Sequence, residues 1–363
     1  MRHRFHALCP YFAMFPEAFA EHWIEVLTRR GEAVLDPFCG RGTTPFQALL
    51  MGRRAVACDI NPVAYCVTRA KTNAPSAQKL MRRIGDLERR YRAEDDRTRE
   101  EMPEFFSYAY HPETLAELLF LRERLRWRAT DTDCMLAALI LGSLHGEAKE
   151  TAPYLSNQMP RTISTKPDYS IRYWQRHGMA APRKDVFALL RDRVDYRYAS
   201  EPPEDTAHVM CADMRELPRR GMVAHGSIRT VITSPPYLDV TNFEEDQWLR
   251  LWFLGHAPHP TRGVISHDDR HYGIEQYWAL IADTWRTLGA LLGKKSNVVM
   301  RVGMKGVAPE RIAEGLLGCS VVTGRKVKLV STETSEIRRR QTDAFRPGSK
   351  GCLLELDAHF AIA

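Results

Sequence analysis

The stretch DPFCGRGTT, residues 36–44, decides the fold of this chain. A short apolar run at 33–35 leads into it, and it opens the next helix. Gly40 and Gly42 supply the backbone freedom of a tight turn, and the helix start offers free N–H groups. The pattern therefore predicts a strand, a glycine turn and a helix, with an anionic or polar ligand at the turn.

The segments around this turn complete a nucleotide-binding unit. Helical spacing at 16–29 precedes the turn, and a second strand at 55–58 ends at Asp59 before a helix at about 62–71. This order is that of a right-handed βαβ unit. Further strand-like segments follow at 208–211, 228–232, 297–302, 326–331 and 352–359. We therefore predict an α/β fold with a mostly parallel sheet of about seven strands.

A long helical insertion separates the second strand from the third. Its expected helices are 77–95, 112–126, 131–150 and 183–196, and later helices are expected near 244–254, 274–292 and 309–317. We divide the chain into a catalytic domain, 1–75 with 201–363, and a helical insertion at 76–200 that is a candidate target-recognition region.

Composition narrows the class of protein. The 363 residues are 44% hydrophobic and 27% charged, as in a globular chain, and a net charge of +7 suits a polyanionic partner. No apolar run approaches the roughly 18 residues of a membrane span, and the start MRHRFHALCP lacks the core of a secretory signal. We expect a cytoplasmic protein without membrane contact. The eight cysteines form no CxxC pair and the histidines no HExxH cluster, so no metal is expected.

Two carboxylates favour one cofactor over another. Asp59, at a strand end, can accept both hydroxyls of a ribose, which also suits a nicotinamide dinucleotide. Such enzymes usually carry a third glycine, however, where this chain has Thr43. Asp36 would repel a diphosphate but attract the ammonium of a methionine moiety. The balance favours S-adenosyl-L-methionine, although a glycine turn alone also fits simple close packing.

A second turn, TSPPYLDV at 233–240, follows the strand at 228–232. Its two prolines fix the backbone and leave carbonyls free as acceptors. An exocyclic amine on a base is a poor nucleophile, and acceptors such as Ser234 and the Pro235 carbonyl would make it more reactive. Tyr237 can stack on a base that has left the duplex. The alternative is an ordinary strand-ending turn, which the pairing with the first turn disfavours.

These residues resemble the amino-methyltransferase family of DNA enzymes, which make N6-methyladenine and N4-methylcytosine. DPFCGRGTT resembles the family's cofactor motif, SPPY (234–237) its catalytic motif, and YFAMFPEAF (11–19) the motif that closes over the methionine moiety. The likeness covers about residues 5–75 and 205–360 and implies a Rossmann-like methyltransferase fold. The family's recognition region usually lies later in the chain than the insertion found here.

The resemblance also implies roles for single residues. Phe15 and Pro16 would face the methionine end, Asp59 the ribose and Asp213 the adenine amine. The implied cofactor-binding set is Phe15, Pro16, Asp36, Phe38, Gly40, Gly42, Thr43, Thr44, Asp59, Ile60, Asp213 and Met214. The implied catalytic set is Ser234, Pro235, Pro236 and Tyr237.

Serine at the head of PPY resembles the cytosine-N4 members, so we expect methylation of cytosine N4 in double-stranded DNA after base flipping. An N6-adenine DNA enzyme and an RNA base amino-methyltransferase are alternatives, because some adenine enzymes carry serine there and some tRNA enzymes have similar turns. A catalytically silent DNA-binding partner of a restriction system is a third. A cognate restriction endonuclease is a candidate partner, and the chain is expected to be a monomer or homodimer.

Two basic segments are candidates for DNA contact. Residues 156–178 interleave basic and aromatic side chains, which suits backbone contacts and stacking on bases. Residues 338–351 join two strands and would form a basic hairpin loop that grips phosphate. The named candidates are Arg161, Lys166, Arg172, Arg176, Arg338, Arg339 and Arg340. The alternatives are a packed structural loop and a solvated loop.

Overall fold

The chain is seen here as a computed structural model that describes residues 2–11, 15–93, 102–146, 154–159, 166–221, 223–238, 242–266, 273–336, 352 and 354–363. It divides into two compact units. The helical unit comprises Met1–Pro10, Arg69–Pro202 and Asn242–Arg262, and the sheet unit comprises Tyr11–Thr68, Pro203–Thr241 and Gly263–Ala363.

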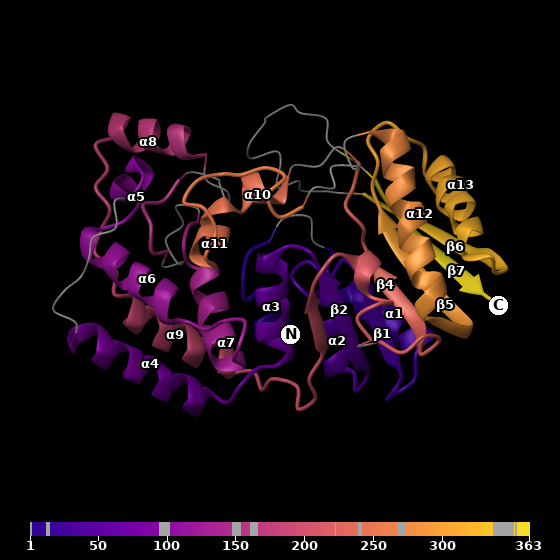
Figure 1. The fold of residues 1–363 in the computed structure, drawn as a ribbon, viewed down its shortest axis with the longest axis horizontal. Coiled ribbons are helices and arrows are strands. Elements are labelled where there is room, and N and C mark those ends of the chain that lie inside the picture. Colours follow the sequence, from indigo (N-terminus) through magenta and orange to yellow (C-terminus); the bar gives the residue numbers. More distant parts are fainter. Residues whose placement is uncertain are drawn as a thin grey trace. The chain divides into compact units, whose positions relative to one another are not determined.

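The sheet unit is built on seven strands in the order β3-β2-β1-β4-β5-β7-β6 (Figure 1). The first five in this order run parallel, and β7 pairs antiparallel with both β5 and β6. The strands are β1 (Ala33–Asp36), β2 (Arg54–Asp59), β3 (His208–Cys211), β4 (Ile228–Thr233), β5 (Leu292–Val302), β6 (Val327–Glu336) and β7 (Leu354–Ile362). The predicted α/β class, the mostly parallel sheet and the helical interruption after the second strand are confirmed.

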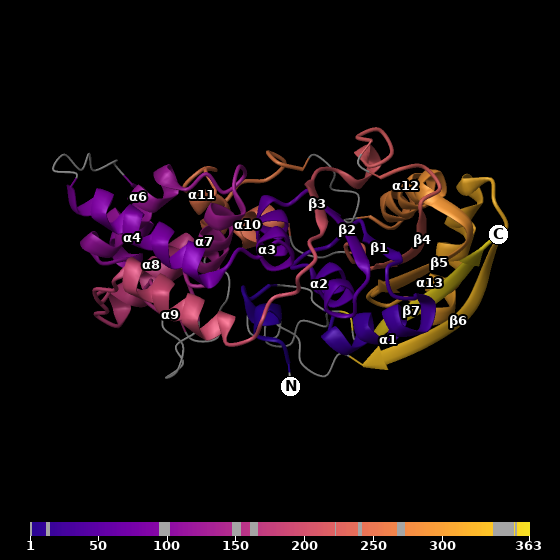
Figure 2. The same cartoon turned by 90° about the horizontal axis from the view of Figure 1, so that it is seen from below.

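Successive side chains of each strand point to opposite faces of the sheet, so each face packs against its own hydrophobic core. Val34 packs with α1 (Glu17–Leu27) and α2 (Thr43–Leu50), whereas Leu35, one residue on, packs with α12 (Ile274–Leu291) and α13 (Pro309–Cys319). Figure 2 shows α1 and α12 on opposite sides of the strands. The result is a sheet between two layers of helix, as parallel sheets require.

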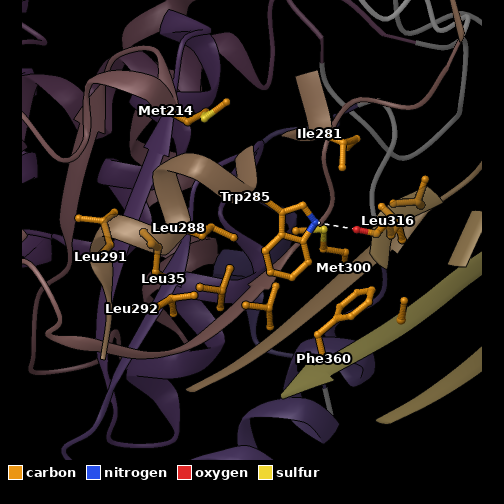
Figure 3. Close-up of a cluster of buried hydrophobic side chains, with 14 of the residues drawn as sticks. Leu35, Met214, Ile281, Trp285, Leu288, Leu291, Leu292, Met300, Leu316 and Phe360 are labelled. Atoms are coloured by element: carbon orange, nitrogen blue, oxygen red, sulfur yellow. Dashed lines mark hydrogen bonds between the residues drawn. The ribbon is translucent and has the colours of Figure 1, made fainter. Parts of the chain in front are cut away.

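Trp285 of α12 is the largest side chain in the core on the α12 face (Figure 3). Its indole N–H donates to the Leu316 carbonyl at 2.9 Å, and its ring meets Phe360 of β7 edge to face at 5.2 Å. The buried tryptophan thus has a partner for its only polar atom, and it joins α12, α13 and the sheet.

The helical unit holds most of the insertion. A short 3-10 turn at Arg4–Ala7 precedes it, and α3 (Pro62–Thr72) leads into it from the sheet unit. Its helices are α4 (Ala77–Ala93), α5 (Glu104–Ala109), α6 (Pro112–Arg124), α7 (Asp131–Leu141), α8 (Pro167–Arg176), α9 (Val186–Tyr198), α10 (Phe243–Asp246) and α11 (Trp248–Phe253). No helix among the described residues is long and apolar enough to cross a membrane.

Two predicted helices are too long. The helix expected at 131–150 ends at Leu141, and the next residue, Gly142, lies so close to the Leu8 carbonyl oxygen that an added Cβ would be 2.5 Å from it. The helix expected at 244–254 breaks at Gln247, whose backbone leaves the helical region, into α10 and α11. Residues 242–262 also cluster with the helical unit, although the sequence placed them in the catalytic part.

Candidate active site

The glycine turn is a tight connection between β1 and α2. Its backbone is closed by hydrogen bonds from Cys39 N to Cys58 O at 3.0 Å and from Gly42 N to Cys39 O at 2.6 Å. Gly40 and Gly42 have φ values of +49° and +70°, in the left-handed region that favours glycine. Gly42 is also pressed against Thr68, whose side-chain atoms would lie 2.5–2.9 Å from an added Cβ. Only glycine fits this position.

Gly42→Ala is therefore expected to destabilise the fold by more than the roughly 1–2 kcal/mol that a left-handed backbone costs. Gly31→Ala is a matched control, because Gly31 has a φ of +81° but no atom within 4 Å of an added Cβ. Urea unfolding of both variants isolates the Thr68 contact. Equal losses of unfolding free energy would show that the close approach contributes nothing.

Asp59, at the end of β2, holds the turn in place. Its Oδ2 atom accepts from Gly40 N at 2.8 Å and its Oδ1 atom from Asn61 N at 2.9 Å. Burial raises the pKa of this carboxyl to about 6, although both hydrogen bonds lower it. Each carboxylate oxygen keeps a lone pair for another donor. Ile60 lies half-buried beside it.

Asp36, at the end of β1, is fully buried with one oxygen unused. Its Oδ1 atom accepts from Thr233 Oγ1 at 2.6 Å and from Phe38 N at 3.2 Å. Among the described residues no hydrogen bond of good geometry reaches Asp36 Oδ2, although the buried Thr44 hydroxyl lies near this carboxyl and lowers its pKa. Burial raises the pKa of Asp36 to about 7, and the nearby Asp59 charge adds to the shift. A buried carboxylate oxygen without a donor is costly, so it marks a place for a cationic donor.

The Asp36–Thr233 hydrogen bond joins the two turns. Chain order reverses between β1 and β4, which lie next to each other in the sheet, and ligands of such sheets bind outside the strand ends at this point. Thr233 ends β4 and is followed directly by Ser234. The glycine turn and the SPPY turn therefore lie at one edge of the sheet, as the sequence predicts.

The SPPY turn is held by hydrogen bonds to β5 and β7. Ser234 Oγ donates to the Arg301 carbonyl at 3.0 Å and also lies beside the Tyr237 hydroxyl, so its oxygen keeps a lone pair for an incoming N–H. Pro235 is buried and Pro236 exposed. The Tyr237 hydroxyl donates to Glu355 Oε1 at 2.8 Å. Burial, with the Glu355 charge, raises the pKa of Tyr237 well above its usual range, so the phenol stays a donor.

The remaining predicted cofactor residues lie in several environments. Phe15 is buried against Phe19 at a ring distance of 4.9 Å, whereas Pro16 is exposed at the start of α1. Asp213 accepts from the backbone N–H and the guanidinium of Arg215 at 2.6–2.9 Å. Met214 is buried in the core around Trp285, and Phe38 packs against that core while half-buried. Thr43 is buried.

Sequence reasoning missed an ion-pair cluster beside the SPPY turn. Arg301 of β5 contacts Asp357 and Glu355 of β7, and all three side chains are mostly buried. The signal was present, because Arg301 interrupts the apolar run VVMRV at 298–302 and charged side chains are rarely buried without partners. The partners themselves lie more than 50 residues further along the chain.

The predicted DNA-contacting residues are only partly described. Lys166, Arg172 and Arg176 are exposed on or next to α8, whose opposite face buries Ser170 and Trp174. Residues 337–351 connect β6 to β7, whose end residues Glu336 and Leu354 pair, so the predicted hairpin connection is confirmed. Arg161, Arg338, Arg339 and Arg340 lie outside the described residues.

Comparison with known proteins finds sequence matches to parts of this chain. Residues 3–68 match the family model described as DNA methylase. The type II methyltransferase M.MvaI of Kocuria varians is 34% identical over 91 residues, which are 24% of this chain and 19% of that protein. M.MjaII of Methanocaldococcus jannaschii is 29% identical over 82 residues, 23% of this chain and 16% of that protein.

The chain thus spans less than a fifth of the length of either curated relative. Among solved structures, TrmN from Thermus thermophilus has a TM-score of 0.38 and 12% identity, covering 99% of this chain and 52% of that one. Residues 3–68, which hold the first turn, are therefore similar to DNA methylases, and the matches do not separate N4 from N6 members.

Proposed function

We propose that this protein transfers a methyl group from S-adenosyl-L-methionine to the exocyclic N4 amine of cytosine in duplex DNA, after the base leaves the stack. The observation that carries the proposal is the Asp36–Thr233 hydrogen bond, which joins the glycine turn to the SPPY turn at one sheet edge. The family match over 3–68 and the names of the curated relatives support it.

The residues at the first turn fit this cofactor. Among the described residues no hydrogen bond of good geometry reaches the buried Asp36 Oδ2, with only the Thr44 hydroxyl near this carboxyl, and the ammonium of the methionine moiety would supply a charged donor. The remaining lone pairs of Asp59 suit ribose hydroxyls, and Gly40 lets the backbone approach closely. When bound, S-adenosylmethionine supplies a methyl group on a sulfonium, which is an activated leaving group.

The second turn would prepare the target amine. Ser234 Oγ and the Pro235 carbonyl would each accept a hydrogen bond from one N–H group of the amine. These two bonds would concentrate the lone pair on the nitrogen and direct that lone pair at the methyl carbon. The nitrogen–carbon bond forms as the carbon–sulfur bond breaks, and the extra proton of the amine leaves to solvent. The Tyr237 ring would stack on the flipped base. Serine at the head of the motif favours cytosine as the target.

Ser234→Ala is expected to lower the single-turnover methylation rate by about 100-fold while leaving cofactor affinity intact, because Ser234 touches the amine and not the methyl donor. Ser227→Ala is the matched control, because this serine is exposed just before the other end of β4. Rates and calorimetric dissociation constants are measured for both. A collapse of cofactor affinity with an unchanged rate would mean that Ser234 belongs to the cofactor site.

The test of the function itself uses labelled S-adenosylmethionine with duplex DNA, single-stranded DNA or tRNA. Digestion to nucleosides and mass spectrometry then identify the product. N4-methylcytosine from duplex DNA is the expected result. N6-methyladenine, or a methylated base from tRNA alone, would replace the proposal with one of its alternatives. Resistance of the methylated DNA to a restriction endonuclease would identify the cognate partner.

We also propose that the helical insertion, 76–200, supplies base readout. One exposed face of α8 carries Tyr169, Arg172 and Arg176 at helical spacing, whereas Trp174 anchors the other face through a hydrogen bond to the Gln158 carbonyl at 3.2 Å. A rigid helix with exposed arginines and an aromatic ring suits contacts to base edges and phosphates. The basic loop 338–351 would mainly grip phosphates.

Arg172→Ala or Arg176→Ala is expected to change the spread of methylated sequences, because a base-edge contact contributes about 1–3 kcal/mol of discrimination. Arg90→Ala removes the same charge from an exposed position of α4 and should leave the preference unchanged. Sequencing of methylated sites measures both. The assignment would be reversed if the α8 variants kept the sequence preference and Arg338→Ala relaxed it. The loop at 338–351, and not α8, would then read the bases.

A further inference from the structure

Arg301 is a buried cation at the point where β5 and β7 meet. Arg301 and Asp357 are direct partners in the antiparallel register, and the guanidinium binds the carboxylate through two hydrogen bonds of 2.6 Å each. Both residues are no more than 6% exposed. A two-bond pair of this kind fixes the direction of the guanidinium as well as its charge.

Glu355 extends the pair towards the SPPY turn. It lies two residues before Asp357 on β7, hence on the same face of the sheet, and its Oε2 atom is 3.5 Å from Arg301 Nη1. Its other oxygen, Oε1, accepts the Tyr237 hydroxyl. Glu355 therefore connects the buried arginine to the aromatic ring that would hold the base.

The Tyr237 ring is fixed at a second place as well. A Cβ added to Gly303, just after β5, would lie 2.9 Å from the ring atoms Cδ2 and Cε2. Contact with the bare glycine backbone and the anchored hydroxyl together restrict both the tilt and the position of the ring. A stacking platform held in this way needs little ordering when a base arrives.

Arg301 also contacts Ser234 and a side chain of α1. Its backbone carbonyl accepts the Ser234 hydroxyl at 3.0 Å, and its guanidinium carbon lies 4.0 Å from the centre of the Phe19 ring, which packs on Phe15. A single residue of β5 thus contacts the amine-binding serine directly, the stacking tyrosine through Glu355, and Phe19 of α1.

We propose that Arg301, Asp357 and Glu355 form a positioning network that sets Ser234 and Tyr237 for the target base, with Glu355 as the residue that anchors Tyr237. The inference rests on the proposed function for its kinetic consequence but not for its geometry. In this network the three residues act through Ser234 and Tyr237 rather than on the reacting atoms themselves.

The test compares Glu355→Ala, Glu355→Gln, Tyr237→Phe and the double variant Glu355→Ala/Tyr237→Phe. Glu355→Ala should lower the single-turnover rate by about 10- to 100-fold, the loss expected for a misplaced reacting group, with cofactor affinity unchanged. Glu355→Gln keeps an acceptor for the Tyr237 hydroxyl, so its single-turnover rate should fall much less than that of Glu355→Ala. In the Tyr237→Phe background the hydroxyl is already absent, so Glu355→Ala should cost little more.

Glu333→Ala is the matched control. Glu333 pairs with Asp357 on β6, on the same face, but it is exposed. A rate loss from Glu333→Ala as large as that from Glu355→Ala, or losses that multiply in the double variant, would overturn the proposal. Thermal melting of each variant shows whether any loss comes from unfolding instead.

A second readout does not depend on the substrate. With tyrosine labelled by 13C at Cζ, the NMR signal of Tyr237 is assigned from its absence in Tyr237→Phe. It should shift in Glu355→Ala and stay in place in Glu333→Ala. An unshifted signal in Glu355→Ala would refute the anchoring even if the enzyme works as proposed. A wild-type protein that methylates no nucleic acid would refute the function, while the NMR result still decides the anchoring.

Discussion

Asp36→Asn is expected to weaken S-adenosylmethionine binding at pH 8 by about 10- to 150-fold, which corresponds to the roughly 1.5–3 kcal/mol of a hydrogen bond to a charged group. The variant keeps the shape of Asp36, and its carbonyl oxygen can still accept from Thr233, as Oδ1 does at 2.6 Å. What it loses is the negative charge that, under the proposed function, would face the cofactor ammonium. Titration calorimetry measures the change.

Asp36→Asn should also change how the affinity for S-adenosylmethionine depends on pH. Burial raises the pKa of Asp36 to about 7, so the side chain is neutral in the free protein at lower pH. Binding of the ammonium requires the carboxylate, so the affinity of the wild type should fall by about tenfold per pH unit below 7. Asp36→Asn should be nearly flat between pH 6.5 and 8, above the pKa of about 6 of Asp59.

The stability of the cofactor-free protein should change with pH in the direction opposite to that of the cofactor affinity. A carboxyl whose folded pKa is raised stabilises the fold fully below its unfolded value near 3.8, and this contribution is lost as the pH rises through about 7. The wild type should therefore melt at progressively lower temperature across this window relative to Asp36→Asn. Asp205→Asn, an exposed site in the sheet unit, is the control. Equal pH slopes of affinity in wild type and Asp36→Asn would refute the assignment.

Local patterns predicted the parts of the site that lie at strand ends. A strand followed by a glycine turn, and another by SPPY, are both short stretches whose chemistry is visible without knowing the fold. Parallel strands then bring their ends to one edge, so Asp36 and Thr233 could be expected to meet. The structure adds that Asp59 holds the turn itself through Gly40 N, which no spacing indicated.

The Arg301 cluster could not be predicted in the same way. It depends on the antiparallel register of β5 and β7, and a shift of one residue would turn Asp357 to the opposite face of the sheet. The close approach of the Leu8 carbonyl to Gly142, directly after α7, likewise joins segments that are distant in the sequence. Pairings between segments far apart in sequence decide both features, and hydrophobic periodicity carries no information about them.

Arg301→Met is expected to destabilise the fold by about 3–5 kcal/mol, because it leaves the carboxylates of Asp357 and Glu355 buried without their cation. The matched control is Arg311→Met, which breaks the exposed 2.9 Å pair with Glu314 on α13 and should cost no more than about 1 kcal/mol. Urea unfolding measures both. Similar small losses would mean that the buried pair contributes no more than a surface one.

Arg301→Met/Asp357→Leu separates stability from positioning. Replacing a buried ion pair by apolar side chains is often neutral or stabilising, so the double variant should recover most of the unfolding free energy that Arg301→Met loses. The methylation rate should not recover with it, because Glu355 still lacks the guanidinium 3.5 Å away that holds it towards Tyr237. A rate that returns together with stability would show that Arg301 serves the fold alone. A stable but slow double variant would mean that the buried charges are retained to position the catalytic turn.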